Sequence, residues 1–160
     1  MEKTDTPPNR KRADGQVTGL AGEFFVAAEL LKRGLQTSLT FGNAKAIDLL
    51  AFNPRTERSF TVQVKAIRRK NVFPIAHAKV NPLHTYVFVI LNDPGQAVQY
   101  FIVPGDTLAK EPERFVARWF MDQKFPGINW RVLQEQGFAD AWQVFDAPLL
   151  ATSIDGHCAS

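Results

Sequence analysis

The chain has little cysteine, little histidine and no long hydrophobic run, and these absences exclude several classes of protein. Cys158 is the single cysteine among 160 residues, which excludes a disulfide framework and a thiolate metal site. No stretch approaches the roughly 20 apolar residues that a bilayer-spanning helix needs. The polar N-terminus, which carries Pro7 and Pro8, lacks the pattern of a signal peptide. We therefore expect a cytoplasmic protein with no membrane partner.

A large excess of one charge is also missing, because 19 Lys and Arg residues stand against 16 Asp and Glu residues, for a net charge of +3. The basic residues cluster in a polar tail, at residues 10–12, and directly after a predicted strand, at Arg68, Arg69 and Lys70. Such clusters permit a polyanionic partner such as nucleic acid. Short basic clusters are more often solvated surface, so other residues must decide between the two.

The length and composition predict one folded domain. An apolar content of 45% and a charged content of 22% are ordinary for a globular protein, and 160 residues suffice to bury a core. We assign residues 1–15 to a disordered basic tail, residues 16–150 to a single domain and residues 151–160 to a flexible C-terminal tail.

Hydrophobic periodicity predicts helices in this domain. The first covers residues 17–33 and ends at Gly34. Its buried apolar face is expected to consist of Leu20, Phe24, Ala27, Ala28 and Leu31. Residues 106–121 should hold a helix that is broken near Pro112, and residues 133–145 a final helix. That last helix is expected to add three aromatic residues to the core: Phe138, Trp142 and Phe145.

Runs of β-forming residues predict five strands. They are residues 35–41, 46–52, 60–67, 86–91 and 98–103. The run at residues 86–91 is continuously apolar, as expected of a strand covered on both faces. Residues 68–84, with two prolines and mixed polarity, fit no regular element. The order of helices and strands predicts an α/β fold.

The tripeptide Gln63-Val64-Lys65, at the end of the third predicted strand, is the most informative feature of the sequence. Alternation along a strand puts Gln63 and Lys65 on one face and buries Val62 and Val64 on the other. Lys65 would be partly desolvated among apolar neighbours, which suits a lysine that contacts phosphate. The alternative is an edge-strand lysine that discourages aggregation.

Two carboxylates precede this strand. Asp48 stands between Ile47 and Leu49, where a lone carboxylate is costly unless it is paired or binds a cation. The alternative is an ion pair with Lys45 or an arginine. Glu23 lies beside the apolar stripe of the first helix and can face the sheet that this helix covers.

Gly19 and Gly22, just before Glu23, would allow another backbone or a ligand to approach the helix closely. The alternative is a ragged helix start, with an early acidic residue favoured by the helix dipole. His77 and His84 have no partner at a recognisable spacing, so neither receives a role.

Along the chain, the motifs run from Glu23 on a helix to Asp48 on a strand and Gln63-x-Lys65 on the next strand. This order resembles that of the PD-(D/E)xK nuclease superfamily, and specifically its Gln-x-Lys branch, which includes group I intron-associated endonucleases. The resemblance covers residues 16–70 well and the strands that follow more loosely. It rests on Gly22-Glu23, on residues 26–30 with Gly34, on residues 46–50 and on residues 62–65. Gln63 replaces the usual second acidic residue, and Ile47 stands in place of the motif's proline.

The resemblance implies a restriction-endonuclease-like core with a central mixed β-sheet flanked by helices. It also implies a Mg²⁺-dependent endonuclease that hydrolyses DNA phosphodiester bonds with activated water, with Mn²⁺ as a substitute. Asp48 would be the main metal ligand, helped by Glu23 and Gln63, and Lys65 would orient the water or steady the developing charge.

Arg68, Arg69 and Lys70 are expected to contact the DNA. A homo-oligomer is expected as well, because a symmetric dimer most easily makes two cuts in a duplex. The alternatives are a catalytically inactive nucleic-acid-binding or assembly module that keeps the nuclease fold, and a nuclease that acts on RNA.

Overall fold

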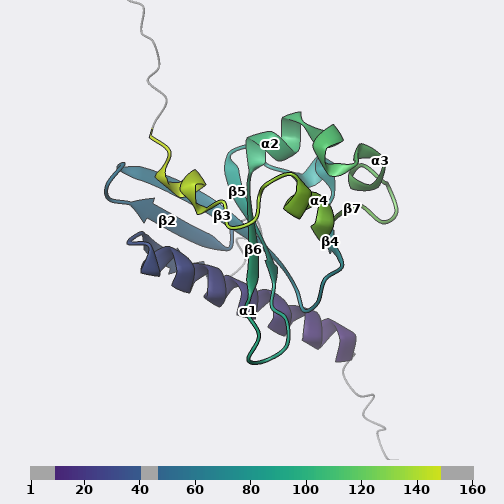
Figure 1. Ribbon diagram of the computed structural model, residues 1–160, viewed down its shortest axis with the longest axis horizontal. Helices are drawn as coiled ribbons and strands as arrows, with labels where there is room; N and C mark the ends of the chain where they lie inside the picture. Colours follow the sequence, from purple (N-terminus) through teal and green to yellow (C-terminus); the bar gives the residue numbers. More distant parts are fainter. Residues whose placement is uncertain (1–9, 41–46, 149–160) are drawn as a thin grey trace, which may run out of the picture.

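Runs rich in β-branched and aromatic residues form a five-stranded mixed sheet at the centre of the molecule. The computed structural model describes residues 10–40 and 47–148 (Figure 1). The strands are β1 (Gln36–Leu39), β2 (Leu49–Asn53), β3 (Arg58–Ile67), β5 (His84–Ile90) and β6 (Gln99–Pro104), in the order β1-β2-β3-β5-β6. β3 and β5 pair in parallel, and the other pairs are antiparallel. The five predicted strands and the α/β fold class are confirmed.

The sheet separates two apolar cores. On one face, Leu30, Val62 and Trp142 belong to a cluster that includes α1 (Arg10–Lys32). On the other face, Phe88 and Leu108 belong to a cluster that includes the later helices. Figure 1 shows α1 on one side of the sheet and α2, α3 and α4 on the other. Every residue of β5 is buried, as the continuous apolar run predicted.

Helix α1 packs on the sheet through a different face from the one predicted. Its buried row is spaced four residues apart and consists of Thr18, Gly22, Val26 and Leu30. Ala27 is buried as expected, but Leu20, Phe24 and Leu31 are each about half exposed, and Ala28 is exposed too. Because Gly22 brings the helix backbone close to β3, the row of residues that contains Gly22 faces the sheet, and the row that contains Leu20, Phe24 and Leu31 does not. The helix also begins at Arg10, so residues 10–15, assigned to the tail, form its first turns.

The C-terminal half follows the predicted break but not the predicted last helix. Three short elements occupy residues 105–120: α2 (Gly105–Lys110), η2 (Pro112–Phe115) and α3 (Ala117–Phe120). The prediction of one helix over residues 133–145 was wrong. The structure has α4 (Trp130–Glu135) and η3 (Trp142–Asp146), separated by a turn at Gly137 with φ 80°. The three aromatic core residues predicted here are nevertheless buried.

The connection between the parallel strands β3 and β5 contains no α-helix. Residues 68–83 instead hold β4 (Val72–Pro74) and η1 (His77–Lys79). β4 pairs with β7 (Gly127–Asn129), and the sequence predicted neither strand. Parallel strands are usually joined by a helix that covers the sheet. Its absence leaves the face of β3 that carries Gln63 and Lys65 open.

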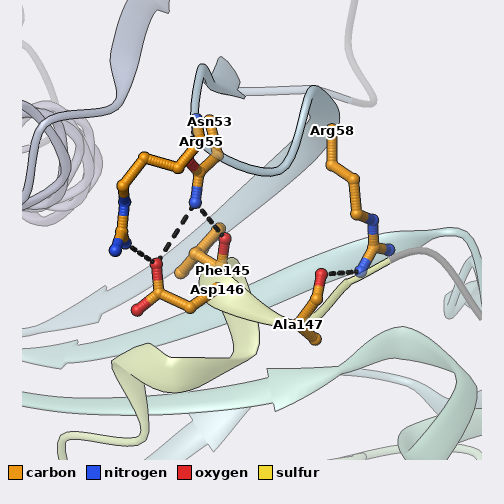
Figure 2. Close-up of polar contacts among 6 residues, drawn as sticks. All are labelled: Asn53, Arg55, Arg58, Phe145, Asp146 and Ala147. Atoms are coloured by element: carbon orange, nitrogen blue, oxygen red, sulfur yellow. Dashed lines mark hydrogen bonds and ion pairs between the residues drawn. The ribbon is translucent and has the colours of Figure 1, made fainter.

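The segment after β6 is tied back to the turn between β2 and β3 (Figure 2). The Asn53 side-chain amide donates to the carbonyl of Phe145 at 2.8 Å, and Arg55 pairs with the carboxylate of Asp146. Arg58 donates to the carbonyl of Ala147 at 2.7 Å. Asn53 is almost fully buried, so its hydrogen bonds fix η3 against the hairpin that leads into β3.

Some predictions fall outside the described residues: most of the N-terminal tail (residues 1–9), the C-terminal tail at residues 151–160 and the isolated Cys158. Across residues 10–40 and 47–148, no helix combines the length and the hydropathy needed to cross a bilayer.

Candidate functional site

The candidate site lies beside the first residue of β2, where β3 extends beyond its pairing with β2. Leu49, the first residue of β2, pairs with Val62, and β3 continues to Ile67 in parallel with β5. Asp48 directly precedes Leu49, so it stands at the point where the two antiparallel strands part. Strand ends of this kind present side chains and free backbone groups at the edge of a sheet.

Asp48 is held in place by both of its neighbouring strands. Its carboxylate Oδ2 accepts a hydrogen bond from the backbone N–H of Val64 at 2.7 Å. Its own N–H donates to the carbonyl of Val62 at 3.0 Å, and its carbonyl accepts from the N–H of Thr40 at 3.0 Å. These bonds fix the carboxylate against β3. Lys45, an alternative ion-pair partner, lies outside the described residues.

Gln63 and Lys65 face a cleft on the open side of β3. The cleft has a volume of about 930 Å³, and both side chains line it. Val62 and Val64 point to the opposite face, where they are buried beneath α1. The alternation predicted for this strand is therefore confirmed. Gln63 pairs in register with Tyr86, which also lines the cleft.

Glu23 reaches the site from α1 because that helix packs closely on β3 at the preceding residue. A Cβ atom on Gly22 would lie 2.5 Å from the Cβ atom of Ala66, so only glycine fits there. Burial raises the pKa of the Glu23 carboxyl, and the negative charge of Asp48 raises it further. The two carboxylates are thus electrostatically coupled. Gly19 has open space around its Cβ position and makes no such contact.

The oxygen atoms of this site suit a hard cation. Two coupled carboxylates repel each other, and in the described part of the chain no ion pair neutralises either one. Among the same residues, no three His, Cys, Asp or Glu side chains converge, so a third protein ligand would be an amide oxygen, such as that of Gln63, or a backbone carbonyl. Oxygen ligands are those preferred by Mg²⁺, whereas zinc favours nitrogen and sulfur.

His84 belongs to the site region although the sequence offered no role for it. It begins β5, pairs in register with Thr61 and lines the same cleft. The Asn81 Oδ1 atom accepts from the N–H of Leu83 at 2.9 Å, which turns the Asn81 Nδ2 donor toward His84 Nε2 at 3.1 Å. Nε2 is therefore the acceptor, and the ring proton lies on Nδ1, which has no hydrogen-bond partner.

Burial and the charge of Asp48 act on the His84 ring in opposite directions. Burial lowers the pKa of the His84 ring, and the charge of Asp48 opposes part of that shift. No spacing in the sequence could identify this residue, because its place depends on the pairing of β3 with β5.

His77, by contrast, bonds to the backbone carbonyl of Ala109 at 3.0 Å and lies outside the cleft.

The basic cluster at Arg68, Arg69 and Lys70 lies beyond the end of β3 and does not line the cleft. All three are exposed beside a separate hollow of about 560 Å³. Arg69 pairs with Asp93 at 3.1 Å, and the Lys70 ammonium lies 4.5 Å from the centre of the Trp130 ring. The structure therefore places the Asp48 carboxylate on the backbone of Val64, between Gln63 and Lys65 in sequence, and couples it electrostatically to Glu23. Gln63 and Lys65 line the cleft, whereas the two carboxylates and the basic cluster do not.

Comparisons with protein families and with curated proteins give no match for this sequence. Among solved structures, the bacterial homing endonuclease I-Ssp6803I matches with a TM-score of 0.52. The match covers 82% of this chain and 91% of the other. The chain has a nuclease-like fold. At 15% sequence identity the likeness concerns the fold alone, so the chemistry must be argued from the site.

Proposed function

We propose that the protein is a metal-dependent endonuclease of the Gln-x-Lys branch of the PD-(D/E)xK superfamily, and that it hydrolyses phosphodiester bonds in DNA. The observation that carries the proposal is the hydrogen bond from the Val64 N–H to the Asp48 carboxylate, which fixes this carboxylate on β3 between Gln63 and Lys65 in sequence. The electrostatic coupling of Asp48 to Glu23 and the position of Gln63 and Lys65 in the cleft support it. The nuclease-like fold supports it. A cytoplasmic location, expected from the sequence, is part of the same proposal.

Each of the four residues has a role that its surroundings support. Asp48, Glu23 and Gln63 would hold Mg²⁺ or Mn²⁺, which when bound acts as a Lewis acid and lowers the pKa of water. Asp48 is the anchor, because the hydrogen bond from Val64 fixes its carboxylate. Lys65 lines the cleft on the same face as Gln63, where its ammonium group would contact the phosphate of the substrate.

The cleft suits a polyanionic substrate. Its lining includes Lys65, Lys79 and Lys124 but no Asp or Glu. A concave surface lined by one sign of charge attracts the opposite charge and raises its local concentration. Arg68, Arg69 and Lys70 would extend this field along the DNA beyond the cleft.

Cleavage of supercoiled plasmid tests the proposal. The unmutated protein should nick the plasmid with Mg²⁺ or Mn²⁺ and not in EDTA. Asp48→Asn keeps an acceptor for the Val64 N–H but removes the charge, so it should abolish nicking and leave DNA binding intact. The matched control, Asp106→Asn, changes an exposed carboxylate paired with Lys110 and should cleave normally. Nicking that survives in Asp48→Asn would refute the site, and metal-independent DNA binding without cleavage would identify an inactive binding module.

A two-fold dimer built on α1 completes the proposal. Val17, Leu20, Phe24 and Leu31 are exposed and follow one another at intervals of three, four and seven residues, which puts them in a seam on one side of the helix. Val17 and Leu31 lie seven residues on either side of Phe24, so a second copy of the chain can pair with this seam in antiparallel orientation about Phe24. Sedimentation should show a dimer that Phe24→Glu dissociates and that Leu50→Glu, at an exposed apolar residue of β2, leaves intact. A monomeric unmutated protein would overturn this part.

A further inference from the structure

Phe125 is the most exposed large apolar residue that the structure describes, and it stands on the rim of the candidate cleft. Its exposed fraction is 86%, and it lines the same cleft as Gln63 and Lys65. On its other side it borders an apolar hollow of about 510 Å³ together with Trp119. Leaving a phenylalanine ring in water is unfavourable unless a ligand covers it.

The backbone of this residue is fixed. Asp122 Oδ1 accepts from the N–H groups of Lys124 at 2.8 Å and Phe125 at 2.7 Å. These two hydrogen bonds lower the pKa of the Asp122 carboxyl. The next residue, Pro126, accepts a hydrogen bond from Ile75 at 3.3 Å, at the start of the β4–β7 pair. An exposed ring on a fixed backbone loses little entropy when it binds.

We propose that Phe125 stacks on an unpaired base of DNA bound in the cleft. The inference rests on the proposed function for its DNA partner and adds how that DNA is held. The lysines at positions 65, 79 and 124 supply the charge that attracts the backbone, and Phe125 supplies an aromatic face beside them. Stacking on an aromatic side chain suits any base, because every base has a π-face. The protein would therefore favour DNA with a base out of its stack, such as a fork or a junction.

Binding to forked DNA tests this without cleavage. All proteins carry Asp48→Asn, the buffer contains EDTA, and fluorescence anisotropy reports the affinity. Three probes share one duplex: a blunt duplex, a fork with unpaired thymidines and the same fork with abasic residues in place of those thymidines. Phe125→Ala should weaken binding to the thymidine fork about tenfold. It should leave the abasic fork and the blunt duplex unchanged, because neither offers an unpaired base. Phe125→Trp should restore the fork preference.

The control is Leu83→Ala, since Leu83 is equally exposed, at 85%, but does not line this cleft. It should bind all three probes as its parent does. An equal loss for Phe125→Ala on the thymidine and abasic forks, or no loss on either, would overturn the inference. Cleavage by the unmutated protein is measured in the separate plasmid assay. If the unmutated protein does not cleave DNA but Phe125-dependent fork binding persists, the proposed nuclease activity is refuted and the stacking role is supported.

Discussion

The carboxylate of Asp48 and the backbone N–H of Val64 are joined by a hydrogen bond of 2.7 Å between Oδ2 and N. One side chain thus satisfies a backbone donor of β3 where the neighbouring strand ends, and carries the charge on which the proposed chemistry depends. Asp48 therefore has a structural role, through its hydrogen bond, and a proposed chemical role, through its charge. Different substitutions of Asp48 can separate the two.

Asp48→Asn and Asp48→Ala should differ in stability but not in activity. Both remove the charge, so both should be inactive. Asparagine keeps an oxygen that accepts from Val64, whereas alanine leaves that partly buried donor without its partner. We expect Asp48→Ala to be less stable than Asp48→Asn by about 1 kcal/mol in urea unfolding. Equal stability would show that the hydrogen bond contributes nothing.

The two glycines of α1 should respond in opposite directions to alanine. A Cβ at Gly22 would collide with Ala66, so Gly22→Ala should destabilise the protein by about 1–3 kcal/mol and displace Glu23. Gly19 has open space, and Gly19→Ala should stabilise the helix by up to about 1 kcal/mol. Thermal unfolding of both variants checks the pair. Adding Ala66→Gly to Gly22→Ala should restore stability, and a failure to do so would point to another cause.

Glu23→Gln should change the pH dependence of stability in metal-free buffer. The pKa of Glu23 is raised above its ordinary value of 4.5, so the folded state holds this proton more tightly than the unfolded state does. The stability contributed by the protonated group is present below that ordinary value and is lost as the pH rises through the raised pKa. Glu23→Gln should therefore gain stability relative to the unmutated protein between pH 4 and pH 7.5. A difference that is the same at both pH values would contradict the raised pKa of Glu23.

Gln63→Glu should bind Mg²⁺ severalfold more tightly, because a carboxylate is a stronger ligand for a hard cation than an amide oxygen. Isothermal calorimetry measures the affinity. Gln143→Glu adds the same charge at an exposed position on η3 and should leave the affinity unchanged. If both variants bind the metal equally, Gln63 does not face the ion.

The sequence predicted what depends on local pattern. The alternation of residues 62–65 needs only the period of a strand, and the structure shows Val64 buried and Lys65 in the cleft. The break near Pro112 is local as well, because proline lacks a backbone N–H.

The failures concern contacts with distant parts of the chain. The buried face of α1 is chosen by the close approach of Gly22 to Ala66, which no helical wheel contains. β4 and β7 are three residues long and exist because they pair across more than fifty residues of sequence. His84 joins the cleft through the parallel register of β3 and β5. Each depends on a partner that the local sequence does not identify.

The alternation along β3 has a genetic consequence. Odd-numbered Gln63 and Lys65 face the cleft, while even-numbered Val62 and Val64 fill the core. Residues that line the cleft therefore alternate one by one with residues that stabilise the fold. Loss or gain of one codon between the turn after β2 and Gln63 would exchange the two faces, burying the lysine and exposing the valines. Such in-frame changes should damage folding far more than a conservative substitution within the strand, which leaves the alternation intact.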